Sequence, residues 1–273
     1  MARQPGRRAR GRPREDGGEA RQPTVQALDR GMRLLTVLSN CDRATLSELA
    51  DGVELAPSTV HRLLETLRQH AVVEFDETDQ TWAVGIEAFR IGSTYLLRTN
   101  YIETGRQMMR RMVERTDETA NIAVPDSGGV VFVSQVETQQ PIRAFFPPGT
   151  HGYMHASGIG KAILAEYSRE RVEQVVADHG LPAFTENTIT GLDTLLDDLA
   201  GIRARGWAVD DQERQLDMRC LAAPIFNEFG EVVAGISISG PAGRLSAARM
   251  ADYGPLVRES ADEVTRMIGG SRR

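Results

Sequence analysis

Three positions in the second half of the chain have the residue types and spacing of a small-anion site. A helix that begins at Gly158 offers backbone N–H groups without intrahelical partners, at the positive end of the helix dipole. Ser237 and Ser239 lie two apart on a predicted strand, so both hydroxyls face one side, while Ile236 and Ile238 turn toward the core. Serines at alternate strand positions usually mark only a solvated face. Together with the helix start, however, they predict a binding site for a carboxylate.

Polar side chains on another predicted helix, residues 57–69, have the chemistry of DNA recognition. An apolar stripe at helical spacing faces inward: Val60, Leu63, Leu64 and Leu67. The remaining faces carry four polar residues near the helix start: Ser58, Thr59, His61 and Arg62. Such side chains reach base edges and phosphates in a major groove, and Arg62 is the best single candidate for a contact.

The elements around this helix predict a winged helix-turn-helix. Thr45 and Glu48 have capping-box spacing, so a short helix opens there, and Gly52 is expected to break it. Residues 70–75 and 81–84 are typical of two strands joined by a polar turn, which would form the wing. The alternative is an ordinary helical hairpin whose polar face meets water. The strand pair favours the DNA-binding interpretation.

Four segments are predicted along the chain. Residues 1–22 form a disordered Arg-rich tail, 23–85 the DNA-binding domain, 86–100 a linker helix and 101–273 an effector-binding domain. The first helix of the DNA-binding domain is expected at 24–39, with an inward apolar stripe of Val25, Leu28, Met32, Leu35 and Leu38. The linker helix serves either in dimerisation or in packing on its own domain.

Helices and strands mix along the predicted effector-binding domain. Helices are expected at 102–115, 158–167, 169–179, 192–202 (capped by Gly206) and 246–268. Strands are expected at 119–124, 130–136, 142–146, 207–210, 220–226 and 231–239. This order predicts an α+β fold in which helices cover a sheet.

Charge is distributed unevenly along the chain of 273 residues. The formal net charge is −6, but residues 1–22 carry seven Arg against three acids, a net of +4. Residues 23–100 sum to −4 and residues 101–273 to −6. The positive charge needed to bind DNA must therefore come from the tail, from the recognition surface and from the duplication of both in an oligomer.

Composition excludes several classes of protein. No apolar run approaches the roughly 20 residues of a membrane span, and the Arg-rich start lacks the apolar core of a secretory signal. We therefore expect a cytoplasmic protein without membrane partners. Cys41 and Cys220 are the only cysteines, too few and too isolated for a disulfide framework or a zinc site. Neither a metal nor a cofactor is expected.

The tail contains a short motif, Arg10-Gly11-Arg12-Pro13, with the pattern of an AT-hook core. Such an element lays Arg10 and Arg12 in a narrow A·T minor groove. The simpler alternative, a basic tail that touches phosphates without sequence preference, is favoured because four residues are a weak signal.

Five segments in this order resemble the IclR family of bacterial transcription regulators: Ser58–Leu64, His155–Ala162, Gly206–Asp211, Cys220–Ile225 and Gly235–Ser239. The resemblance covers nearly all of residues 24–268. It implies a winged helix-turn-helix, a GAF-like effector domain, and homodimers that often pair into tetramers on double-stranded operator DNA.

The resemblance also implies an effector site. Members that bind glyoxylate or pyruvate use two consecutive amides at a helix start, an Asp, a Cys ten residues later and two Ser at i, i+2. These map onto Gly158, Ile159, Asp210, Cys220, Ser237 and Ser239. A smaller residue is common at the position of Ile159, whose bulk is expected to narrow the pocket. The implied effector is a small 2-oxo acid, with glyoxylate the leading candidate.

Other roles for the same residues remain open. Asp210 repels a carboxylate beside it, so it is expected at the far end of the site, and Cys220 is most simply a weak donor. Alternatively, Cys220 is the nucleophile of an enzyme or a redox switch, although no histidine pattern places a base beside it. Lys161 is expected to be solvated, and the alternative is that it adds positive charge near the anion. Three further residues are expected as an apolar pocket wall or as core: Phe145, Phe146 and Met154.

Overall fold

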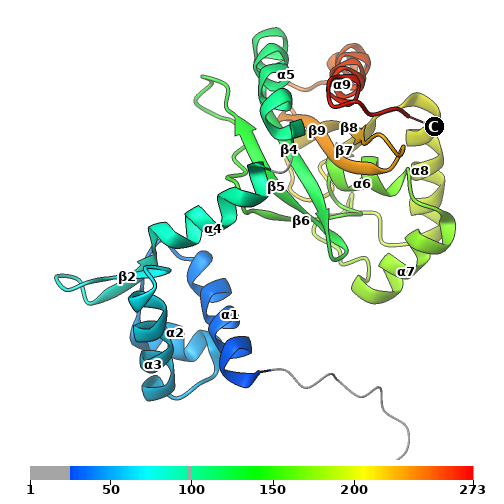
Figure 1. Ribbon diagram of the computed structural model, residues 1–273. Helices are drawn as coiled ribbons and strands as arrows, with labels where there is room; N and C mark the ends of the chain where they lie inside the picture. The colour runs from blue at the N-terminus through cyan, green and yellow to red at the C-terminus, as the bar shows by residue number, and fades with distance from the viewer. Residues whose placement is uncertain (1–24, 98–99, 273) are drawn as a thin grey trace, which may run out of the picture. The chain divides into compact units, whose positions relative to one another are not determined.

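The computed structural model describes residues 25–97 and 100–272, and the chain divides after Thr94 into two compact units (Figure 1). Each unit has its own apolar core. The predicted tail, with Arg10 and Arg12, lies outside the described residues. No helix in the described ranges is long and apolar enough to cross a membrane.

The first unit is a helix-turn-helix followed by a strand hairpin, as predicted. Its elements are α1 (Gln26–Ser39), β1 (Ala44–Thr45), α2 (Leu46–Val53), α3 (Pro57–Gln69), β2 (Val73–Asp76) and β3 (Thr81–Val84), before α4 (Ile86–Leu97). The three strands form an antiparallel sheet of order β1-β3-β2. The hairpin of β2 and β3 is the wing.

Local signals set the ends of α2 and α3. The Thr45 hydroxyl accepts from the Glu48 N–H at 3.4 Å, and the Glu48 carboxylate accepts from the Thr45 N–H at 2.8 Å, which completes the predicted capping box. The prediction that Gly52 breaks α2 is wrong. The helix continues through Gly52 to Val53 and ends where Glu54 takes a left-handed conformation with φ of 55°.

The inward face of α1 differs from the predicted stripe. Gly31, Leu34 and Leu38 are buried, whereas three of the five predicted residues are exposed: Val25, Leu28 and Met32. The helix therefore carries two adjacent apolar faces, and only one of them packs in the core of the unit, with Leu49, Val60, Leu64 and Trp82.

The second unit contains a six-stranded antiparallel sheet of order β6-β5-β4-β9-β8-β7. Its helices are α5 (Asn100–Thr116), α6 (Gly158–Leu164), α7 (Arg169–His179), α8 (Leu192–Arg205) and α9 (Ala247–Met267). Its strands are β4 (Thr119–Asp126), β5 (Gly129–Val136), β6 (His151–Tyr153), β7 (Ala208–Asp211), β8 (Met218–Phe226) and β9 (Val232–Pro241). The predicted α+β class is confirmed.

Helices cover both faces of this sheet (Figure 1). On one face, α5 and α9 pack on the side of the sheet that carries Ile236 and Ile238. On the other, α6, α7 and α8 enclose a second core with Ala208 and Ala222. Alternate residues of β8 and β9 therefore point into different layers, and those beside α6 form the floor of the site below.

The predicted strand at 142–146 is absent from this described segment. Pro141 precedes it and Pro147 and Pro148 follow, so N–H donors that would extend a ladder are missing at both ends. The edge strand is instead β6, which pairs with Gly129–Val131 of β5.

Candidate functional site

A cavity of about 470 Å³ lies in the second unit, between the start of α6 and the sheet. Five of the six predicted effector residues border it: Gly158, Ile159, Asp210, Cys220 and Ser239. Ser237 does not. It is fully buried two residues along β9, where its hydroxyl lies close enough to the Cys220 thiol to lower the pKa of that group.

Strand register brings three of these side chains into one row. Asp210 on β7 lies opposite Cys220 on β8, and Cys220 lies opposite Ser239 on β9. Directly opposite residues in antiparallel strands point to the same face, here the face covered by α6. The Ser239 hydroxyl also accepts a long hydrogen bond, 3.5 Å, from the Asn121 side chain on β4.

The start of α6 closes over this row. Ser157 is the N-cap, and its hydroxyl accepts from the Gly160 N–H at 3.1 Å. A Cβ on Gly158 would lie 2.7 Å from Cys220 Sγ, so only glycine permits this approach of helix and strand. The Ile159 side chain packs against Gly235 in the core, so its backbone N–H, which has no acceptor among the described residues, is the group available to a ligand.

Burial sets the charge state of Asp210. It is 9% exposed, and burial raises its pKa to about 6, against the opposing effects of the Glu213 N–H and the Lys161 charge. Its Oδ1 accepts from the Glu213 N–H at 2.8 Å. Near neutral pH this carboxyl can therefore take up a proton, which lessens its repulsion of a nearby anion.

Asp210→Asn is expected to raise the free energy of unfolding by about 3 kcal/mol at pH 7 and to leave it nearly unchanged at pH 4. The native pKa of about 6 exceeds the ordinary value of 3.8, so ionisation favours the unfolded state. Wild-type stability then falls as pH rises from about 4 to 6, whereas asparagine stays neutral and keeps an oxygen for the Glu213 N–H. Urea unfolding at several pH values measures the difference. A difference that is the same at every pH contradicts the raised pKa.

The chemistry of Cys220 does not suit a nucleophile. Burial, with the nearby Asp210 charge, raises the pKa of its thiol to about 12, although the hydroxyls of Ser239 and Ser237 and the Gly158 N–H oppose this shift. The thiol is therefore protonated at neutral pH, while both nucleophilic attack and oxidation proceed through the thiolate. His151 borders the same cavity, but no hydrogen bond between it and Cys220 occurs among the described residues.

Aromatic rings form the outer wall of the cavity. Phe132 and Phe146 stack with ring centroids 4.9 Å apart, and Phe145 and Tyr153 also face the space. Of the three residues expected as wall or core, Met154 belongs to the core.

Two arginines that the sequence did not single out also border the cavity. The Arg214 guanidinium lies 4.0 Å from the centroid of the Phe184 ring and has no ion pair within the described ranges. Arg219 is already neutralised, because its Nε donates to Asp211 at 2.6 Å. The sequence feature that could have identified them is their position in the connection between two predicted strands.

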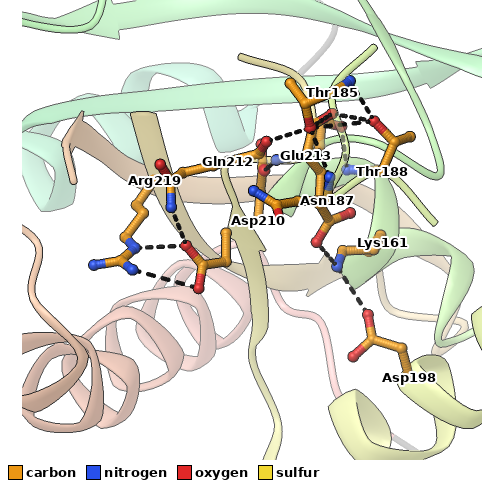
Figure 2. Close-up of polar contacts among 12 residues, drawn as sticks. Lys161, Thr185, Asn187, Thr188, Asp198, Asp210, Gln212, Glu213 and Arg219 are labelled. Carbon is orange, nitrogen blue, oxygen red and sulfur yellow. Dashed lines mark hydrogen bonds and ion pairs between the residues drawn. The ribbon is translucent and has the colours of Figure 1, made fainter. Parts of the chain in front are cut away.

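Lys161 contradicts the prediction of a solvated side chain. It is 1% exposed and forms ion pairs with Asp198, at 2.8 Å, and with Glu213, at 2.5 Å (Figure 2). It does not border the cavity. It meets α8 and the connection after β7, so position near a helix start was a poor guide to exposure.

The predicted DNA-binding residues of the first unit lie on α3. Ser58, His61 and Arg62 are exposed, and Thr59 is half-buried. Arg62 has no ion pair among the described residues, whereas Arg68 on the same helix pairs with Glu65 at 2.8 Å. Its guanidinium is therefore free to meet a base edge or a phosphate.

Comparison with known proteins covers both units. Residues 27–77 match the IclR helix-turn-helix domain, and residues 93–266 match the C-terminal domain of bacterial IclR regulators. The chain is 45% identical over 261 residues to the HTH-type transcriptional regulator BhcR of Paracoccus denitrificans, covering 94% of each chain. It is 39% identical to the transcriptional repressor IclR of Escherichia coli, covering 91% of this chain and 92% of the other.

A solved structure supports the same assignment. The crystal structure of Thermotoga maritima IclR superposes with a TM-score of 0.73 at 27% identity, over 90% of this chain and all of that one. The curated relatives are transcriptional regulators, which makes this chain a regulator and not an enzyme. With both family domains present in order, the chain belongs to the IclR family of bacterial DNA-binding transcriptional regulators.

Proposed function

We propose that operator binding by this regulator is controlled by a small carboxylic acid held in the cavity beside α6, with a 2-oxo acid, and glyoxylate first, as the leading candidate. The observation that carries the proposal is the convergence of three strands and one helix start on a single cavity. Sequence positions 158, 210, 220 and 239 meet there although they are far apart along the chain.

Each wall of the cavity has a part in this proposal. The Ile159 N–H, the Ser239 hydroxyl and the Cys220 thiol are donors for a carboxylate, and Asp210 lies at the other end of the row. A protonated Asp210 donates to an oxygen of the acid, and an ionised one accepts from a hydrated aldehyde. The regulator acts without a metal or an organic cofactor in this proposal.

The size of the cavity bears on which acid fits. Cavities of about 300–1,000 Å³ accommodate drug-sized ligands, so 470 Å³ leaves room for larger acids as well as for glyoxylate. The stacked Phe132 and Phe146 suit a ring or an aliphatic tail. The acids to compare are therefore glyoxylate, pyruvate and, as an aromatic probe, 4-hydroxybenzoate.

Ser239→Ala is expected to weaken acid binding about tenfold or more, because it removes a hydrogen bond to a charged group. Ser237→Ala is the matched control. Its hydroxyl does not border the cavity, so this variant should bind within about twofold of wild type. Calorimetric titration of the full chain with the three acids measures both. Equal losses in the two variants would place the acid elsewhere.

We also propose a homodimer, or a dimer of dimers, that binds a double-stranded operator in the cytoplasm. Its support is the uncovered apolar face of α1 and the exposed Ile86 and Phe89 of α4, since exposed apolar patches mark protein contacts. The GAF-like assignment of the second unit belongs to the same proposal, supported by an antiparallel sheet between two helical layers. A monomer in sedimentation of the full chain would contradict the assembly.

A further inference from the structure

Lys161 is a buried cation that the cavity does not use. Its Nζ lies 2.8 Å from Asp198 Oδ2 on α8 and 2.5 Å from Glu213 Oε1 in the connection between β7 and β8 (Figure 2). The Lys161 and Glu213 side chains are 2% and 7% exposed. A buried ion pair adds little net stability over well-packed apolar residues, but removal of one partner leaves an uncompensated buried charge.

Glu213 connects this ion pair to the cavity. Its backbone N–H donates to Asp210 Oδ1 at 2.8 Å, and its backbone oxygen accepts from Thr188 Oγ1 at 2.6 Å. The next residue, Arg214, borders the cavity. The Glu213 segment therefore contacts Asp210 on one side and leads directly into Arg214 on the other.

The other end of the ion pair lies on the helix that borders the same cavity. Lys161 is three residues after Gly158, which approaches Cys220 closely. One side chain thus joins two walls, the start of α6 and the connection after β7, and α8 braces it through Asp198.

We propose that Lys161 is a positioning residue of the acid site, which holds the Glu213 segment against α6 and thereby fixes Asp210 and Arg214 at the cavity wall. The role in acid binding rests on the proposed function above. The placement of the Glu213 segment is a property of the ligand-free protein, so the two ideas are separable.

The electrostatics agree with this geometry. Burial raises the pKa of Glu213 to about 7 and that of Asp210 to about 6, and the Lys161 charge opposes both shifts. The charged or titratable residues that face Asp210 are Glu213, Lys161, Asp211, Cys220 and, through its N–H, Arg214, and Asp198 also faces Glu213. Glu213 Oε2 already has no hydrogen-bond partner in the described part of the chain. Without Lys161, both carboxyls are expected to hold protons to higher pH.

Three variants of the full chain test the proposal. Lys161→Met removes the cation. The double variant Lys161→Met with Glu213→Gln also removes the carboxylate left without a partner, while it keeps the backbone N–H that reaches Asp210. Arg272→Ala is the control, because it breaks the partly buried ion pair with Glu166, at 2.7 Å, away from the cavity.

Hydrogen exchange of the ligand-free proteins is the first measurement. Lys161→Met is expected to accelerate exchange in residues 211–219, with β4 and β5 unchanged, and the double variant to restore protection. Arg272→Ala should leave residues 211–219 as in wild type. Unchanged protection of this segment in Lys161→Met would overturn the proposal, whether or not an acid binds.

Glyoxylate affinity across pH 5–8 is the second measurement. Lys161→Met is expected to bind about tenfold more weakly, as for one lost charge-assisted hydrogen bond, and to move the pH midpoint of binding upward. The double variant should recover most of the affinity. If Lys161→Met has a lowered melting temperature but binds glyoxylate with the wild-type affinity and pH midpoint, Lys161 is purely structural and the proposal is overturned. Failure of wild type to bind glyoxylate counts against the proposed effector. Hydrogen exchange of the ligand-free proteins then still decides whether Lys161 positions the Glu213 segment.

Discussion

Gly158→Ala is expected to weaken acid binding about ten- to hundredfold. The new Cβ would lie 2.7 Å from Cys220 Sγ, closer than nonbonded atoms approach, so the start of α6 must move away from β8. The Ile159 N–H and the Ser239 hydroxyl then no longer reach the same carboxylate. Loss of one hydrogen bond to a charged group costs about 1.5–3 kcal/mol, which corresponds to the stated range. Calorimetric titration with the acid that binds wild type measures the loss.

Two further variants give this prediction its controls. Gly243→Ala adds the same methyl group at an exposed glycine with no atom within 4 Å, and it should bind like wild type. Gly158→Ala combined with Cys220→Ala removes the sulfur and leaves an ordinary contact of 3.4 Å with the Cys220 Cβ. The double variant should therefore recover the thermal stability that the crowded Gly158→Ala variant loses. Wild-type affinity in Gly158→Ala alone would show that the helix start is not a wall of the acid site.

Arg62→Ala is expected to lower operator affinity about five- to hundredfold. The side chain is exposed on α3 and has no ion pair among the described residues, so it is available to contact DNA. A good arginine contact to a base is worth about 1–3 kcal/mol. A mobility-shift titration with the DNA upstream of the protein's own gene, at fixed salt concentration, measures the change.

Arg169→Ala is the control that distinguishes a direct contact between Arg62 and DNA from the general effect of losing one positive charge. Arg169 is also exposed, pairs with Glu173 on α7 and lies in the second unit, so its loss changes the net charge equally. Its affinity for the same DNA should remain near the wild-type value. Similar losses in the two variants would mean that Arg62 contributes only long-range attraction.

The elements that the sequence predicted well are those governed by local rules. The capping box of Thr45 and Glu48 and the alternation through Ile236 to Ser239 depend on neighbours in the chain. Strand alternation placed both serines on one face, but only the tertiary structure distinguishes Ser239, which borders the cavity, from Ser237, which does not. That distinction depends on where α6 begins above the sheet.

The features that the sequence missed depend on long-range packing. Lys161 is buried because carboxylates from α8 and from the connection after β7 meet it, and these lie 37 and 52 residues away. Likewise, α1 has two apolar faces, and no local rule states which of them the domain core covers. Arg214 borders the cavity only because the chain between β7 and β8 folds back over it.

The measurement that tests the central claim most directly is operator affinity of the full chain with and without a saturating acid, for wild type and Ser239→Ala. Coupling of about 1–3 kcal/mol predicts a change of at least about fivefold in the wild-type dissociation constant for DNA, and the sign of the change gives the direction of regulation. Ser239→Ala should require more acid to give the same change. An identical DNA dissociation constant in wild type with and without glyoxylate, pyruvate and 4-hydroxybenzoate would contradict control by an acid in this cavity.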